Sequence, residues 1–202
     1  MARHGGSLAL CLTGIPIINP RKHAVSPVAQ HHLDLAKSYL EREARGDLAV
    51  IDELMTEDIT LTIISGRSPH TGHAIPWAGE HHGREAAKDF VRRLLAGQNT
   101  RMDVIERWVA DEHTVVAFAT IDASSPTTGR SGSWEIAMRF DFDGDLIAHY
   151  WVYEDSFSAV IMHSTGGTLT MLDSEGTRQA PIVEDLSGAL VAQSSFFRGR
   201  RR

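Results

Sequence analysis

The protein has 202 residues, a formal net charge of −6 at pH 7 and a single cysteine. This length predicts one domain with tails, and 42% hydrophobic with 23% charged residues is typical of a globular chain that buries its own core. The charge excludes a chain-wide basic surface, so we expect no nucleic-acid partner, and one cysteine excludes an internal disulfide. We expect a cytoplasmic protein with no membrane contact, because no apolar run approaches the roughly 18 residues of a membrane span.

Residues 1–26 have no hydrophobic period and are predicted to form an extended N-terminal arm. A folded domain is predicted over residues 27–163, and the Gly-, Ser- and Thr-rich residues 164–202 are predicted to be a mostly flexible tail. We expect a first helix that begins at Ser26-Pro27, and its buried face carries Val28, His32, Leu35, Ala36, Tyr39 and Leu40. A short helix at 48–55, a turn at Glu57-Asp58, a strand at 59–63, a loop at 65–83 and a helix at 84–96 with Leu94 and Leu95 on its buried face should follow. The chain then continues with four strands, at 102–110, 114–123, 133–141 and 146–154, and with a last apolar turn after Asp155.

This order of elements predicts an α+β fold. Four consecutive strands at the end of the domain form a meander, and the three helices before them carry apolar faces that need a partner. We therefore expect a cone-shaped barrel in which one curved antiparallel sheet wraps around three helices. Asp143-Gly144 is typical of a hairpin, and the mouth of such a barrel is a common place for a pocket.

Three stretches carry a resemblance to a known family. They are YLEREARGDLAVIDELMTEDITL (39–61), PWAGEHHGREAAKDFVRRL (76–94) and MRFDFDGDLIAHYWVYED (138–155). Together they resemble the nuclear transport factor two-like superfamily, and within it the SnoaL-like polyketide cyclase and ketosteroid isomerase branch. The resemblance covers about residues 28–163 and implies the same cone-shaped fold. It leaves the activity open, because isomerases, cyclases, dehydratases, epoxide hydrolases and binding modules share this scaffold.

The resemblance implies roles for particular positions. Tyr39 matches the tyrosine that holds an enolate oxygen in the isomerases. The position of their catalytic base is Ile63, and that of their acidic oxygen-binding donor is Ile136. The last-strand aspartate of the epoxide hydrolases corresponds to Val152. Neither steroid isomerisation nor epoxide hydrolysis in its usual form is therefore expected.

The final strand can present either of two sets of side chains to the interior, because a shift by one residue reverses the faces of a strand. One set is Tyr150, Val152 and Glu154, and the other is His149, Trp151 and Tyr153. The register implied by the family resemblance favours the set with Tyr150, Val152 and Glu154.

The remaining polar residues suggest proton transfer. We expect Tyr39 to polarise a carbonyl, with Glu154 or His81 moving the proton. No metal or organic cofactor is expected, because His81 and His82 are adjacent and the His70-x-x-His73 pair lacks a carboxylate at metal-binding spacing. The residues expected to contact the substrate are Trp77, Trp134, Ile136, Met138, Tyr150 and Val152.

These residues lead to two hypotheses about function. The first is an enzyme that catalyses isomerisation, aldol-type cyclisation or dehydration of an apolar, oxygenated small molecule. The second is a non-catalytic ligand-binding or dimerisation module of the same fold. In both cases we expect a homodimer, because the outward residues of the meander mix apolar and polar side chains suited to sheet-to-sheet pairing.

Overall fold

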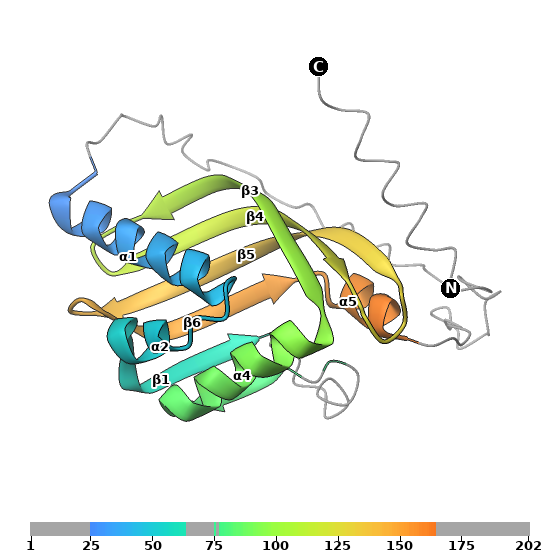
Figure 1. Cartoon of the computed structure of the whole chain (residues 1–202). Helices are drawn as coiled ribbons and strands as arrows, with labels where there is room; N and C mark the ends of the chain where they lie inside the picture. Colours follow the sequence, from blue (N-terminus) through green and yellow to red (C-terminus); the bar gives the residue numbers. More distant parts are fainter. Residues whose placement is uncertain (1–24, 64–74, 76, 165–202) are drawn as a thin grey trace, which may run out of the picture.

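The helices and strands follow the predicted chain order (Figure 1). The computed structural model describes residues 25–63, 75 and 77–164, so the predicted arm up to residue 24 and the predicted tail from residue 165 lie outside the described residues. The elements are α1 (Pro27–Glu43), α2 (Ala49–Leu54), β1 (Met55–Ile63), β2 (Gly79–His82), α4 (Gly83–Gly97), β3 (Asn99–Ala110), β4 (Thr114–Ser124), β5 (Ser131–Asp143), β6 (Leu146–Glu154) and α5 (Ser156–His163).

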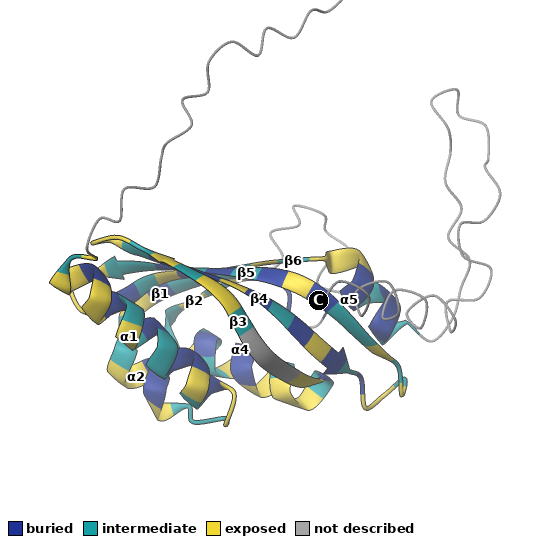
Figure 2. Ribbon diagram, turned by 90° about the horizontal axis from the view of Figure 1, so that it is seen from above, coloured by how far each residue is buried: buried dark blue, intermediate teal, exposed yellow. Residues whose placement is uncertain are grey.

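One curved sheet contains all six strands of the described chain, in the order β2-β1-β6-β5-β4-β3. Figure 2 shows α1, α2 and α4 together on one face of this sheet. Buried side chains line the space between the helices and the sheet (Figure 2). The predicted α+β fold, a curved sheet around three helices, is therefore confirmed.

One strand pair departs from the antiparallel prediction. β3, β4, β5 and β6 are joined by short turns and alternate in direction, but β1 runs parallel to β6, with Leu61 beside Tyr150. Hairpin connections impose antiparallel pairing, whereas β1 and β6 are separated in sequence by most of the domain. Their direction is therefore not set by any local connection, and the sequence pattern could not predict it.

Two predicted boundaries in this region are wrong. Glu57 and Asp58 do not form a turn but lie within β1, on exposed positions of the strand. A register shift between Met55 and Thr60 lets β1 begin four residues before the predicted start. The end of the predicted loop forms β2, a short edge strand that pairs with β1. Its residues, GEHH, have no alternating apolar pattern, which is why the sequence did not reveal it.

Two apolar residues assigned to buried helix faces are exposed. Val28 is 48% exposed, and Ala29 is buried in its place. Leu95 is 42% exposed, because the buried face of α4 is limited to Ala87, Phe90 and Val91, and Leu95 lies beyond its edge.

Helix α1 is fixed at both ends, which determines where its buried side chains lie. At its start, the Ser26 hydroxyl accepts a hydrogen bond from the Ala29 amide at 3.2 Å. In its first half, the His32 Nε2 donates to the Gly144 carbonyl at 3.0 Å, and the ring stacks on Phe142 with centroids 4.2 Å apart. Gly144 has a φ of +56°, as the predicted hairpin requires. The helix is thereby held against the β5–β6 hairpin.

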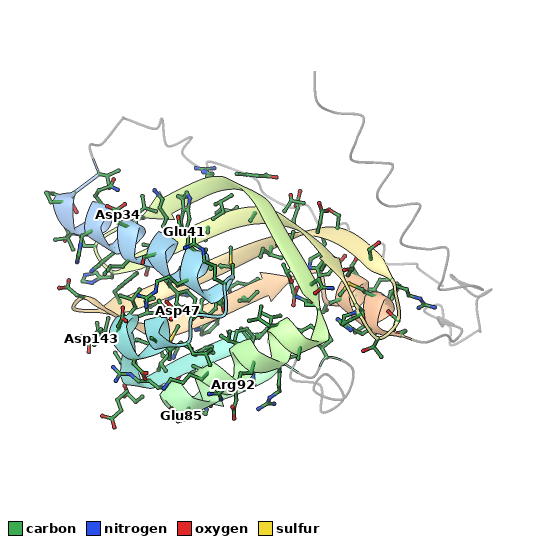
Figure 3. All side chains as sticks on the ribbon, in the orientation of Figure 1. Asp34, Glu41, Asp47, Glu85, Arg92 and Asp143 are labelled. Carbon is green, nitrogen blue, oxygen red and sulfur yellow. The ribbon has the colours of Figure 1, made fainter. Side chains whose placement is uncertain are left out.

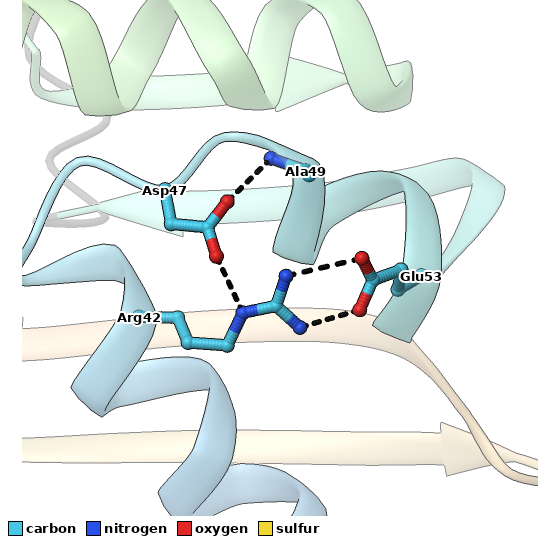
Figure 4. Close-up of polar contacts among 4 residues, drawn as sticks. All are labelled: Arg42, Asp47, Ala49 and Glu53. Atoms are coloured by element: carbon cyan, nitrogen blue, oxygen red, sulfur yellow. Dashed lines mark hydrogen bonds and ion pairs between the residues drawn. The ribbon is translucent and has the colours of Figure 1, made fainter.

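At the other end of α1, Arg42 joins the helix to the α2 segment (Figure 4). Its guanidinium contacts Asp47 at 2.6 Å and both carboxyl oxygens of Glu53. Asp47 also accepts a hydrogen bond from the Ala49 amide at 3.1 Å, so the arginine lies between two carboxylates. A bidentate pair of this kind adds directional restraint to the corner between the two helices.

The outer face of the sheet carries two apolar rows. Phe118, Ala137 and Tyr153 are register partners on adjacent strands, and Phe118 and Tyr153 are 42% and 41% exposed. In the next row, the Arg139 guanidinium lies over the Trp151 ring, 5.5 Å from its centroid. Helices α1, α2 and α4 lie on the opposite face of the sheet (Figure 2).

Helix α5 closes the end of the sheet. Asp155 caps its start, as predicted, by accepting hydrogen bonds from the Phe157 and Ser158 amides. Thr128 and Arg130, in the β4–β5 connection, donate to the carbonyls of Met162 and Ile161. The last carbonyls of a helix have no partner within it, and here the loop supplies one.

Gly97, at the end of α4, packs directly against Trp77. A Cβ atom added at Gly97 would lie 2.4 Å from Trp77 Cζ3, and Trp77 is only 2% exposed. We expect Gly97→Ala to lower the free energy of unfolding by about 1–3 kcal/mol through overpacking, although alanine favours a helix. Urea denaturation measures this change.

The same substitution in a Trp77→Leu background provides the control. With the ring removed, alanine should be neutral or stabilising at position 97, by up to about 1 kcal/mol. An equal loss of stability in both backgrounds would show that the contact with Trp77 is not the cause.

Candidate active site

The helix-facing side of the sheet is arranged in transverse rows of register partners. One row contains His81, Leu61, Tyr150 and Phe140, from β2 to β5. The next row on this face contains Ile63, Val152, Met138 and Ala117. The third contains Glu154, Ile136 and Ala119.

The row of Ile63, Val152 and Met138 is apolar and packs into the core. Ile63 and Val152 are two of the positions at which the resemblance places carboxylates in isomerases and epoxide hydrolases, and the third, Ile136, is 93% buried in the adjoining row. The buried carboxyl groups of this protein come from other positions.

One of these carboxyl groups belongs to Glu43. It lies in the last turn of α1, is 9% exposed, and accepts a hydrogen bond of 2.9 Å from the Tyr39 hydroxyl to its Oε1 atom. Tyr39 is fully buried one helical turn earlier. Residues four apart lie on the same side of a helix, so α1 alone brings the two groups together.

Burial determines the proton equilibrium of Glu43. It raises the pKa of the carboxyl from 4.5 to about 7, and the hydrogen bond from Tyr39 opposes the rise in part. Burial also raises the pKa of the Tyr39 phenol well above 10, with the neighbouring Glu43 and Tyr150 adding to the effect. Near neutral pH, Glu43 can therefore gain or lose a proton while Tyr39 keeps its own.

Tyr150 lies beside this pair. Its ring meets the Tyr39 ring edge-on with centroids 5.4 Å apart, and it stacks on Phe140 at 4.7 Å. The residue is 3% exposed. Burial, with Glu43 and Glu154 on either side, raises the pKa of its phenol well above 10. The parity favoured from the sequence, with Tyr150 on the interior face, is the one the structure has.

Glu154 is a second carboxyl group on the interior face, four residues after Tyr150 in β6. Its Oε2 accepts a hydrogen bond of 2.9 Å from Trp134 Nε1. Burial raises the pKa of the carboxyl, the Trp134 hydrogen bond opposes this, and Asp155 adds to the rise. Four residues of strand place Glu154 roughly 13 Å along β6 from Tyr150. Glu43, and not Glu154, is the carboxyl group hydrogen-bonded to Tyr39.

His81 reaches the interior face, but its ring is already in contact with protein groups. Its Nε2 donates to the Trp77 carbonyl at 2.9 Å, and the ring lies beside Phe90. Leu61 separates His81 from Tyr150 in the same row, a spacing of roughly 10 Å across two strands.

The residues expected to contact a substrate are distributed over two regions. Trp134, Ile136, Met138 and Tyr150 are buried on the interior face of β5 and β6, and Val152 is partly buried between them. Trp77 lies apart from them, between Gly97 of α4 and the ring of His163 in α5. The structure thus places Trp77 in contact with one residue of α4 and one of α5.

The sequence analysis overlooked Glu43. Its signal was present, because Tyr39 and Glu43 stand at i and i+4 in a helix whose face around Tyr39 was predicted to be buried. A glutamate in the last turn of an amphipathic helix is normally solvated, as Glu41 of the same helix is (Figure 3). Only the position of α1 on the sheet shows that Glu43 is enclosed.

Two further properties concern the described residues alone. No three His, Cys, Asp or Glu side chains within this part of the chain are grouped so that they could hold a metal ion. None of the helices placed by the structure is long and apolar enough to cross a membrane.

A curved sheet around three helices, with polar groups on its interior face, is the arrangement of NTF2-like proteins. The sequence pattern of the SnoaL-like domain matches residues 36–150, more than half of the chain, and the protein belongs to this family. The resemblance inferred from the sequence is confirmed.

Individual relatives are more distant. Patulin synthesis protein F of Aspergillus clavatus is 27% identical over 116 residues, which are 55% of this chain and 58% of that protein. The match thus spans less than two thirds of that relative. An NTF2-like protein from Burkholderia xenovorans superposes with a TM-score of 0.59 at 17% identity, covering 67% of this chain and 98% of the other. A protein from Jannaschia sp. CCS1 that is described as a SnoaL-like polyketide cyclase superposes with a TM-score of 0.59 at 15% identity, covering 72% of this chain and 99% of the other. At these identities, the two solved structures show the fold alone.

The raised pKa of Glu43 predicts a specific pH dependence of stability. An acid whose pKa is higher in the folded state stabilises the fold below its unfolded pKa of 4.5, and this contribution disappears as the pH rises to about 7. Compared with Glu43→Gln, the wild-type protein should lose about 3 kcal/mol of unfolding free energy between pH 4 and pH 8. Denaturant unfolding of both proteins across this range measures the difference.

Glu41→Gln is the matched control, because Glu41 is exposed on the same helix. It should follow the wild-type pH profile closely. A constant difference between wild type and Glu43→Gln across the range would contradict a raised pKa at Glu43.

Proposed function

We propose that this protein is an enzyme that transfers a proton within an apolar, oxygenated small molecule without an organic cofactor. The observation that carries the proposal is the buried hydrogen bond between Tyr39 and Glu43, with a carboxyl pKa of about 7. A general acid or base works best when its pKa lies near the working pH. A carboxyl group that is buried for a purely structural role would not accelerate proton exchange in a substrate.

The two oxygens of Glu43 have different surroundings. Oε1 is held by the Tyr39 hydroxyl, whereas no described residue hydrogen-bonds Oε2. In the proposed reaction, Oε2 accepts a proton from a carbon next to a carbonyl group, the C–H electron pair moves toward the carbonyl oxygen, and the same proton returns to another carbon. Tyr39 is then a positioning residue that orients the carboxylate and lowers its pKa.

The substrate class follows from the surroundings and from the family. Apolar side chains of β1, β5 and β6 cover most of the interior face, so the substrate has an apolar body with few polar groups. The relative named for patulin synthesis, and the description of a structural neighbour as a polyketide cyclase, support a natural-product-like compound. Isomerisation, aldol-type cyclisation and dehydration all begin with removal of this proton by Glu43, which then returns it to another carbon, to the new alkoxide oxygen or to the departing hydroxyl group, respectively.

A ligand-binding or dimerisation module of the same fold is the second candidate. It is favoured by the apolar residues Ile63, Ile136 and Val152, which occupy the positions of family carboxylates. Such a module would bind an apolar compound without exchanging its protons.

Proton exchange tests the proposed reaction. The probe is 1-tetralone, a bicyclic ketone, and NMR follows the replacement of its C2 protons by deuterium in D2O. Wild-type protein should accelerate exchange, with a rate that rises through pH 7 and then levels off, because the carboxylate form of Glu43 is the base. Glu43→Gln should lower the rate by about 10²–10⁴, and Tyr39→Phe should move the midpoint of the profile to higher pH.

Two further variants make this test decisive. Glu41→Gln, on the exposed side of α1, should exchange like wild type. Exchange that depends on Glu154 and not on Glu43 would restore Glu154 as the base and refute our assignment. Binding of the ketone without any exchange would favour the ligand-binding module.

We further propose that the protein acts as a homodimer whose contact is the outer face of the sheet, around Phe118 and Tyr153. Two exposed aromatic residues in one row, with a stacked arginine and tryptophan beside them, suit an isologous interface. Phe118→Glu should convert the dimer to a monomer in light scattering at micromolar concentration. Phe157→Glu, at a residue of α5 that is 45% exposed, should leave the dimer intact. A monomeric wild-type protein would contradict the proposal.

A further inference from the structure

Tyr150 is a buried residue whose hydroxyl group makes no hydrogen bond to a described side chain or backbone group. The residue is 97% buried, at the centre of the row formed by His81, Leu61 and Phe140. No hydrogen bond joins its hydroxyl to another residue of the described chain. The hydroxyl is not among the fully enclosed polar atoms of the described chain that lack a partner, so it borders open space where a ligand can accept its hydrogen bond.

Tyr39, in contrast, has already used its proton. A tyrosine hydroxyl carries one hydrogen, and that of Tyr39 is directed to Glu43 Oε1 at 2.9 Å. The resemblance assigned the role of oxygen-binding donor to Tyr39. With a carboxylate next to it, this hydroxyl has only lone pairs left to offer a substrate.

We propose that the hydroxyl of Tyr150, and not that of Tyr39, donates the hydrogen bond that holds and polarises the substrate carbonyl oxygen. The inference rests on the proposed function, since it assigns the second half of the same reaction. When the C–H proton moves to Glu43 Oε2, negative charge develops on the carbonyl oxygen, and the Tyr150 O–H stabilises this charge until the proton returns.

The surroundings of Tyr150 suit this role. Stacking on Phe140, with rings 13° from parallel, and the edge contact with Tyr39 fix the direction of its ring. Glu43 and Glu154 lie near the phenol, and together with burial they raise its pKa well above 10, so it keeps its proton at any physiological pH. A neutral donor fixed in position requires no reorganisation as charge develops.

The chemistry of the site also limits the ligand. The adjoining row of Ile63, Val152 and Met138 offers no hydrogen-bonding side chain. A compound that satisfies this arrangement has one carbonyl oxygen at Tyr150, an acidic C–H directed toward Glu43, and a planar apolar body against the sheet. We therefore expect an apolar cyclic ketone, and not a polyol, sugar or anionic metabolite.

Binding of two probes tests the inference directly. The first is 1-tetralone with a ¹³C-labelled carbonyl, and the second is tetralin, which has the same frame without the oxygen. In wild-type protein, the carbonyl ¹³C signal should move downfield on binding, because the oxygen accepts a hydrogen bond. Tyr150→Phe should abolish this shift and weaken binding of 1-tetralone by roughly 2–10-fold, while binding of tetralin stays unchanged. Unchanged tetralin binding also shows that the variant is folded.

Tyr153→Phe and Tyr39→Phe are the matched controls, because they are the other two tyrosines of the chain. Both should keep the downfield shift; Tyr153 faces outward, and Tyr39 donates to Glu43. A shift that survives in Tyr150→Phe, a shift lost only in Tyr39→Phe, or a wild-type protein that produces no shift would overturn the inference. Glu43→Gln should retain the shift. Absence of proton exchange with the shift present would refute the proposed reaction while leaving the hydrogen bond from Tyr150 in place.

Discussion

The candidate site depends on one constraint, which is the enclosure of the Glu43 carboxyl group between a helix and a sheet. A carboxylate transferred into an apolar interior loses its hydration, and it stays there only if it is neutral or hydrogen-bonded. Tyr39 supplies the hydrogen bond, and the helix supplies the spacing that brings the two side chains together. His32 and Arg42 fix the helix at both ends and so determine which of its residues are enclosed. The packing of α1 therefore determines the environment of the candidate site.

The arrangement also shows how one family accommodates different chemistries. The positions at which ketosteroid isomerases and epoxide hydrolases are expected to carry acids are occupied here by Ile63, Ile136 and Val152. The buried acids come instead from the last turn of α1 and from the end of β6. The scaffold fixes an interior face and leaves open which of its positions carries the reactive group.

The fold was predictable because its signals are local. The Ser26-Pro27 start, the alternation around Trp134 and the Asp143-Gly144 hairpin each reflect the nearest neighbours in sequence, and each is present in the structure. The direction of β1 was not predictable, since its partner β6 is distant in sequence. β2 was missed for a related reason: four residues without alternation form a strand only because the edge of β1 is available to them.

The candidate site was predictable only in part. Tyr39 and the inward set of the last strand could be inferred, because the resemblance supplied a register and strand alternation supplied the faces. The partner of Tyr39 was missed although its i, i+4 spacing places Glu43, and not Glu41, on the face of Tyr39, because a glutamate in the last turn of a helix is ordinarily solvated. Which glutamate is buried depends on the rotation of α1 about its axis, which is set by packing against residues more than 100 positions away, at Phe140 and Tyr150.

The transverse rows of the sheet have a consequence for how such proteins diverge. Each interior position is occupied by one side chain whose neighbours across the strands are fixed by backbone pairing, and the backbone hydrogen bonds of that pairing do not involve the side chain itself. A valine codon becomes an aspartate codon by a single base change, and at Val152 that change would introduce a carboxyl group two residues from Tyr150 and two from Glu154. New catalytic groups can thus arise on this scaffold by point mutation rather than by rearrangement of loops.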